Sequence, residues 1–143
     1  MAHDLHTLLF LIDAEHHRID ALTAQTDRLI ESAADTAQTR DEIRQILHGA
    51  MKLFVTHFLH EHEAMRQVGM PRDQIEAHAI EHDDLMVRLR TAVERLQSGG
   101  TTGEILENLA HHRVAFARHR DTADAALHRC LHAALTLPAP VAR

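Results

Sequence analysis

The sequence has few of the residues that mark disulfide-bonded or β-rich proteins. Its 143 residues include one cysteine, no tryptophan, no tyrosine and four phenylalanines. Because the single thiol of Cys130 cannot form an internal disulfide, we expect a reducing compartment, the cytoplasm. Alanine and leucine are common while aromatic residues make up 3%, which favours helices over strands. Cys130 itself is expected to be a small, buried apolar side chain.

Long apolar runs and an excess of positive charge are also missing. No stretch approaches the roughly eighteen consecutive apolar residues of a membrane-spanning helix, so no membrane association is expected. The chain starts with MAHDLHTLLFLIDAEHH, which mixes acids and histidines into the apolar part and has no basic lead, unlike a signal peptide. The formal net charge of −6 argues against nucleic acid as the main partner.

What the chain does have is a regular helical pattern. Apolar residues recur at alternating steps of three and four along nearly all of it, as in amphipathic helices. Short connections between long helices predict an all-α fold, an up-down-up-down antiparallel four-helix bundle. The bundle domain is expected to span residues 1–137, with a frayed or disordered tail at 138–143. The predicted helices cover residues 3–32, 39–68, 73–98 and 101–135.

The predicted boundaries rest on local signals. Gly69 and Gly99 suit the ends of the second and third helices, because glycine adopts the backbone conformation that follows a helix at little cost. Thr39 and Thr101 are each followed three residues later by glutamate, and this spacing predicts capping boxes at the starts of the second and fourth helices. Asp73 is the expected N-cap of the third helix.

The histidines are the unusual feature, with fifteen in the chain. His57 and Glu61 are four residues apart, and so are His78 and His82, so each pair shares one helix face. In both helices that face is the apolar one, which turns toward the core. Buried imidazole and carboxylate groups need partners, and one metal site would satisfy all of them together.

The first and fourth helices carry further candidates at compatible depths, given a rise of ~1.5 Å per residue. His16 lies on the apolar stripe of the first helix, and His119 and Asp124 lie on the fourth. On a straight helix, residues five apart diverge by about 140°, so Asp124 requires either a local widening of the helix or a side chain reaching in from the flank. Nitrogen and oxygen ligands without thiolate suit Fe, and also Mn or Zn.

Four sequence motifs, one in each predicted helix, are similar to those of the haemerythrin family, specifically of bacterial haemerythrin-like single domains. IDAEHHRI resembles the family's I-D-x-x-H-x-x-L, HFLHE resembles H-F-x-x-E, HAIEH resembles H-x-x-x-H, and HRDTAD resembles H-x-x-x-x-D. The resemblance runs from about residue 9 to residue 131. It implies a centre of two Fe ions with an oxo or hydroxo bridge. The implied metal ligands are His16, His57, Glu61, His78, His82, His119 and Asp124.

The resemblance also implies which ligands hold each iron, and what the protein does. His78, His82 and His119 would hold one iron, His16 and His57 the other, and the two carboxylates would bridge them. Dioxygen would bind reversibly, for storage, delivery or sensing, in a monomer or small homo-oligomer with a separate reductase or signalling partner. The same centre in an enzyme acting on peroxide or nitric oxide, or in an iron-handling protein, remains an alternative. Met70 stands where the family usually has tyrosine, which leaves oxygen affinity and oxidation rate open.

The other histidines need no function to explain them. They are expected mostly at exposed positions: His3, His6, His17, His48, His60, His62, His111, His112, His128 and His132. His112 is the exception to watch, because it lies on the apolar stripe seven residues before His119. At that position His112 would either hydrogen-bond to a ligand side chain or control access to the metal centre.

Overall fold

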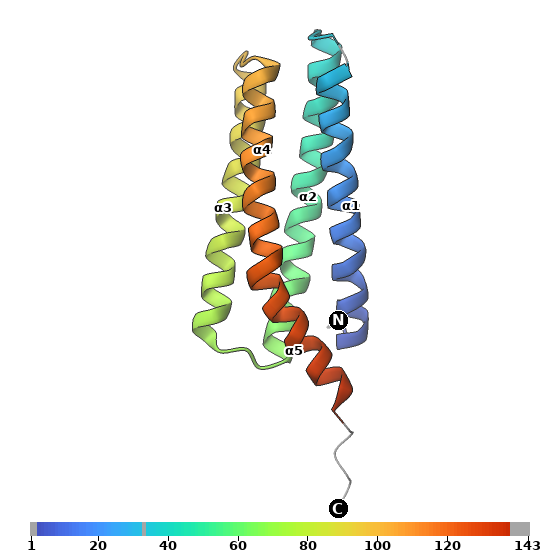
Figure 1. The fold of residues 1–143 in the computed structure, drawn as a ribbon, viewed down its shortest axis with the longest axis vertical. Helices are drawn as coiled ribbons and strands as arrows, with labels where there is room; N and C mark the ends of the chain where they lie inside the picture. Colours follow the sequence, from blue (N-terminus) through green and yellow to red (C-terminus); the bar gives the residue numbers. More distant parts are fainter. Residues whose placement is uncertain (1–2, 33, 138–143) are drawn as a thin grey trace, which may run out of the picture.

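The chain forms a bundle of long helices (Figure 1), which a computed structural model describes for residues 3–32 and 34–137. All regular elements of these two ranges are helical, which confirms the all-α expectation. The expected tail at 138–143 lies outside the described residues. The elements are α1 (Leu5–Ser32), α2 (Ala37–Gln67), α3 (Arg72–Gln97), α4 (Thr102–His119), a π-helical turn η1 (Arg120–Asp124) and α5 (Ala125–Thr136).

Figure 1 shows the long helices side by side, with α5 continuing the direction of α4 beyond a bend. The α1–α2 and α3–α4 connections lie at one end of the bundle and the α2–α3 connection at the other. No helix in the described ranges combines the length and apolarity needed to cross a bilayer.

The start of α2 differs from the prediction. The N-cap is Thr36, in extended conformation, and the Thr39 amide donates to its Oγ1 at 3.1 Å. Thr39 therefore lies inside the first turn and is buried, and the Thr39–Glu42 capping box does not form. The predicted spacing marked the right region, but a threonine three residues earlier performs the capping.

The start of α3 also differs, since Pro71 rather than Asp73 occupies the N-cap position. Proline suits a helix start because its φ is fixed and its missing N–H would have no helical partner there. The glycine signals are confirmed, since Gly69 and Gly99 have φ of +71° and +86°. Thr101 is the N-cap of α4, because its Oγ1 accepts from the Glu104 amide at 3.1 Å, which is one of the two bonds of the predicted capping box.

The segments α4, η1 and α5 together form the fourth rod of the bundle. This rod contains a local widening of the helix, which was one of the two alternatives predicted for Asp124. Between α4 and α5 the backbone makes the π-helical turn η1, which holds one extra residue. Beyond it, the inward-facing residues are Leu127 and Leu131, whereas Ala126 is partly exposed and Cys130 is exposed. The expectation that Cys130 is buried is wrong, because an extra residue rotates everything after it by about 100°.

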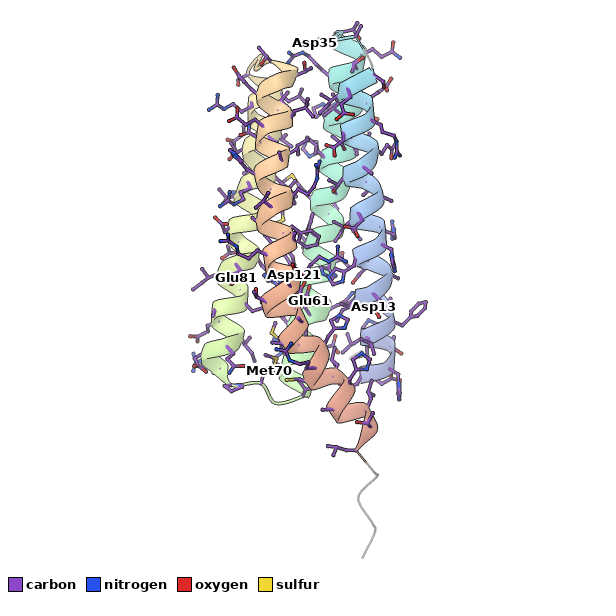
Figure 2. All side chains as sticks on the ribbon, in the orientation of Figure 1. Asp13, Asp35, Glu61, Met70, Glu81 and Asp121 are labelled. Atoms are coloured by element: carbon purple, nitrogen blue, oxygen red, sulfur yellow. The ribbon has the colours of Figure 1, made fainter. Side chains whose placement is uncertain are left out.

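The apolar core is divided into two clusters along the bundle. One includes Ile19, Phe54 and Phe58, together with side chains nearer the α1–α2 connection. The other includes Ile12 and Ala64 near the opposite end. Because His16 lies between Ile12 and Ile19 along α1, and Glu61 between Phe58 and Ala64 along α2, the polar groups lie where the two clusters meet. Glu61 is accordingly nearer the Met70 end of the bundle than the Asp35 end (Figure 2).

Candidate metal centre

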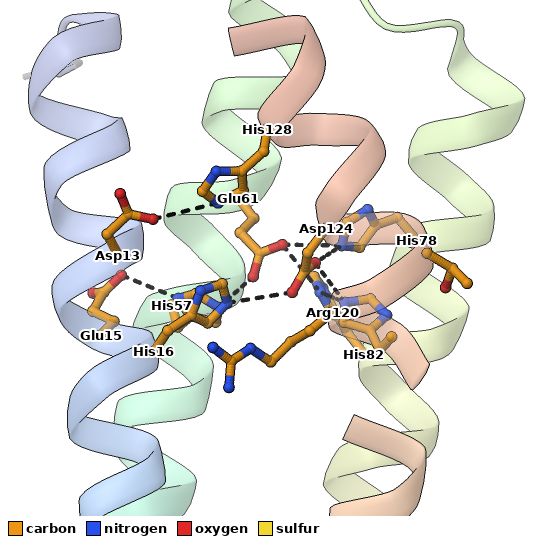
Figure 3. A network of polar contacts seen from close by, with 12 residues as sticks. Asp13, Glu15, His16, His57, Glu61, His78, His82, Arg120, Asp124 and His128 are labelled. Atoms are coloured by element: carbon orange, nitrogen blue, oxygen red, sulfur yellow. Dashed lines mark hydrogen bonds and ion pairs between the residues drawn. The ribbon is translucent and has the colours of Figure 1, made fainter. Parts of the chain in front are cut away.

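All seven sequence-predicted site residues come together inside the bundle, and Figure 3 labels all of them except His119. They arise from every rod: one from α1, two from α2, two from α3 and two from the rod formed by α4 and η1. Each is buried, with between 0 and 7% of its surface exposed. Charged and polar side chains are rarely buried to this degree without partners. The residues are His16, His57, Glu61, His78, His82, His119 and Asp124.

Glu61 occupies the middle of the group. One carboxylate oxygen, Oε1, is in close contact with His57 Nε2, one helical turn away on α2. The other, Oε2, faces α3, where His78 Nε2 lies at 3.0 Å and His82 Nε2 at 3.7 Å. The two oxygens of one carboxylate therefore face imidazoles on two different sides.

The two oxygens of Asp124 also face imidazoles on different helices. Its Oδ1 lies 3.0 Å from His78 Nε2 and 2.9 Å from His119 Nε2, while its Oδ2 lies 3.3 Å from His16 Nε2. The π-turn makes this geometry available, because it brings the fifth residue after His119 back to the inner face of the helix.

The donors fall into two overlapping groups that share both carboxylates. In each group, one ligand atom per residue lies within 4.8 Å of the corresponding atom of every other member. Opposite ligands of one ion lie roughly 4.2 Å apart, twice a metal–nitrogen bond of ~2.1 Å, so small side-chain shifts suffice. One group is His16, His57, Glu61 and Asp124; the other is Glu61, His78, His82, His119 and Asp124.

The hydrogen-bonding state of these atoms tests whether a metal fits. Both oxygens of Glu61 and of Asp124 are buried and lack partners with hydrogen-bond geometry, as do Nε2 of His16, His57 and His78. The ion-pair distances above are short, but the atoms are not aligned as donors and acceptors. His82 Nε2 and His119 Nε2 lie only 3.0 Å apart, so these two ring nitrogens converge. Unpartnered buried groups are costly, and converging lone pairs are what a cation needs. The cluster could therefore hold metal.

The electrostatics of the metal-free site agree with that conclusion. Burial lowers the pKa of His57, but its contacts with Glu15 and Glu61 outweigh burial and raise the pKa to about 9. For His78, Asp124 and Glu61 likewise outweigh burial and raise the pKa to about 9. Without metal, these two imidazoles carry protons that partly neutralise the shared carboxylates. A metal ion would replace those protons with its own charge.

Two carboxylates that sequence reasoning missed lie directly behind the ligands. His57 Nδ1 donates to Glu15 Oε1 at 3.2 Å, and His119 Nδ1 donates to Glu81 Oε2 at 2.5 Å. A carboxylate behind an imidazole fixes its tautomer and turns its Nε2 lone pair toward the metal position. Glu15 was detectable, because Ile12, Glu15 and Ile19 are spaced by three and four residues on one stripe.

Several histidines without a predicted role are not simply solvent-exposed. His60 Nδ1 also donates to Glu15, at 2.8 Å from Oε2, and the ring of His62 stacks on that of His82 with centroids 5.2 Å apart. Phe58 also stacks on His82, with ring centroids 3.7 Å apart. His112 is 3% exposed, so it belongs to the core as its stripe position indicated.

Most of the residues along the access to the site are charged or polar. A cavity of about 560 Å³ reaches His16 and Asp124, and charged side chains of α1, η1 and α5 line its walls. Phe116 lies close to His16, with ring centroids 6.1 Å apart. The cavity lining is Asp13, His16, Ala117, Arg120, Asp121, Asp124, Ala125, His128 and Arg129.

Comparison with protein-family models, with curated protein sequences and with solved structures finds no match to this chain.

Proposed function

We propose that this protein is a non-haem di-iron protein that binds dioxygen reversibly, in an up-down-up-down bundle of the haemerythrin type. The observation that carries the proposal is the pair of overlapping donor groups that share Glu61 and Asp124. Two carboxylates common to two groups are the arrangement expected of bridging ligands. The alternating ends at which the connections lie support the antiparallel order.

The division of the histidines supports a centre with two unequal halves. One group contains three histidines besides the shared carboxylates, and the other contains His16 and His57. With a bridging oxo or hydroxo group, these sets would supply six ligands to one iron and five to the other. A pair of ferrous ions held this way supplies two electrons and one open coordination position to dioxygen.

The chain's own residues would tune that chemistry. Five neutral imidazoles and two carboxylates add less negative charge than the carboxylate-rich sites of ferritin-like proteins, which favours ferrous iron. Phe58, stacked on His82, and Phe116, beside His16, reduce the water near the ligands. Glu15 and Glu81 would hold two of the imidazoles in register.

The test is to load the purified protein with ferrous iron without air, measure iron per chain, then admit air and record the visible spectrum. We expect two irons per chain and a coloured oxygenated form that bleaches when oxygen is removed. A matched variant, Glu61→Gln, should retain at most one tightly bound iron and no such colour. Two irons with an irreversible colour change would contradict reversible binding.

The polar cavity favours one alternative, an enzyme that uses the same centre on peroxide or nitric oxide. Within this alternative the charged lining favours peroxide, because peroxide forms hydrogen bonds whereas nitric oxide and dioxygen are nearly apolar. This alternative predicts multiple turnovers of peroxide or nitric oxide per centre in the presence of a reductant. An iron-handling role would instead give loosely bound iron that a chelator removes within seconds, with no oxygenated form.

A further inference from the structure

A third group of possible metal-ligand side chains shares His16 with the main centre and extends from it toward solvent along the cavity. It consists of Asp13 and His16 on α1 and His128 on α5. One ligand atom of each residue lies within 4.8 Å of those of the others. Asp13 Oδ1 and His128 Nε2 are 3.4 Å apart (Figure 3), and the rings of His128 and His16 are nearly parallel, with centroids separated by 6.2 Å.

We propose that Asp13, His128 and His16 form an entry site that captures a divalent metal ion and delivers it to the main centre. Two imidazoles and a carboxylate suit Fe²⁺, Mn²⁺, Co²⁺ or Zn²⁺. The inference rests on the proposed metal centre, but it does not depend on what that centre does with oxygen.

The exposure of the side chains indicates the path of an ion from solvent to the buried centre. Side-chain exposure falls from 53% for Asp13 to 27% for His128, 9% for His16 and 3% for Asp124. These four residues line the same cavity of about 560 Å³. An ion that enters from solvent therefore meets a carboxylate first, then an imidazole, and then the ligands of the buried centre.

His16 links the two sites, because it belongs both to the entry group and to the deeper group with His57, Glu61 and Asp124. An ion can keep its bond to His16 while it exchanges Asp13 and His128 for the buried ligands. Such a transfer never leaves the ion without protein ligands in the low-dielectric interior, where a bare cation is very costly.

The charges around the cavity leave the route open to a cation. Arg120 lines the cavity, but its Nη1 is held by Asp20 at 3.0 and 2.9 Å, and its guanidinium carbon lies 5.5 Å from the Phe116 ring centroid. Asp121 and Asp13 face the same cavity as Arg129 and offset its charge.

The experiment measures metal uptake by the metal-free full-length protein, with Co²⁺ as the probe. Absorption from coordinated Co²⁺ is followed after rapid mixing in wild type, in an Asp13→Asn/His128→Gln variant and in a Glu31→Gln/His111→Gln control. The control removes one carboxylate and one imidazole from exposed positions on the same two rods, away from the cavity. Circular dichroism checks that all three proteins are folded.

We expect the Asp13→Asn/His128→Gln variant to take up Co²⁺ at least about tenfold more slowly, with the same final number of tightly bound ions, while the control matches wild type. Equal uptake rates in all three proteins would overturn the entry site and leave the proposed function standing. Slowed uptake combined with no reversible oxygen spectrum would overturn the proposed function and leave the entry site standing.

Discussion

At the scale of single residues, Glu15 and Glu81 hold the histidines of the proposed metal centre in place from the side away from the centre. Glu15 and Glu81 each accept a hydrogen bond from the Nδ1 of one ligand histidine. Their surroundings differ, since the Glu15 side chain is 8% exposed and that of Glu81 is 51% exposed. Solvent screens the exposed contact far more than the buried one.

This difference predicts unequal effects of the two matched substitutions. Glu15→Gln should weaken binding of one of the two metal ions by about 10–100-fold, because His57 loses the carboxylate that orients it. Glu81→Gln should have a clearly smaller effect, since water can replace an exposed carboxylate. Calorimetric titration of the metal-free protein with Zn²⁺ measures both. Equal losses in the two variants would contradict the role assigned to burial.

His112 gives a prediction about stability rather than metal. Burial lowers its pKa to about 4, with Arg88 and Arg113 adding to the effect, and its ring packs against Phe54 and Phe116. The folded-state pKa lies below the usual 6.5, so its contribution to stability is complete above pH 6.5 and is lost as the pH falls toward 4. The loss reaches about 3 kcal/mol.

The variant His112→Phe keeps an aromatic ring and removes the titration. Between pH 7 and 4.5, the metal-free wild type should therefore lose about 2–3 kcal/mol more unfolding free energy than the variant does. Urea unfolding of both proteins at the two pH values measures this difference. If the two proteins lose stability in parallel, His112 does not carry the acid sensitivity.

At the scale of elements, the π-turn η1 is the feature that shapes both the site and the packing. It brings Asp124 to the inner face together with His119, and it sets the register in which Leu127 and Leu131 are buried. A π-turn is less favourable than the α-helix that would replace it, and such turns occur mostly at functional sites.

Removing the extra residue tests this account. Deletion of Thr122, which is exposed, should convert the turn to α-helix and keep Leu127 and Leu131 buried, so the thermal stability of the metal-free protein stays equal or rises. Deletion of Ala126, just beyond the turn, should rotate both leucines by about 100° and cost several kcal/mol. Thermal unfolding followed by circular dichroism compares the two. A Thr122 deletion as damaging as the Ala126 deletion would show that η1 is not the adjustable element.

At the scale of the whole molecule, four rods bring ionisable groups to the junction of two apolar clusters. A metal that binds there stabilises the folded chain, because the ligands come together only on folding. The metal must displace protons from His57 and His78, whose pKa values are about 9 in the metal-free protein.

Metal-dependent stability should therefore rise with pH. At a Zn²⁺ concentration of about 100 times Kd, we expect a gain near 2.7 kcal/mol, or roughly 5–10 °C in Tm. At one fixed Zn²⁺ concentration, the gain should be larger at pH 8.5 than at pH 6.5, since below pH 9 each bound proton that must be displaced weakens affinity by up to about tenfold per pH unit. Differential scanning calorimetry with Zn²⁺ and with a chelator, at both pH values, measures the increase in Tm that depends on Zn²⁺. A gain that shrinks as pH rises would contradict the assigned proton displacement.

The sequence by itself determined the helices and the candidate ligands, because helical periodicity and the four-residue spacing of His57 with Glu61 and of His78 with His82 are local properties. It also required either a widening or a flanking approach near Asp124, since a five-residue step does not fit a straight helix.

The tertiary structure decided what depends on contacts between rods. It selected the widening, and with it the exposure of Cys130. It paired Glu15 with His57, and Glu81 with His119, across different helices. It also placed Asp13 beside His128, from opposite ends of the chain. These outcomes depend on the rotation of each helix about its axis and on the distances between helices, which packing sets and which no local pattern of residues encodes.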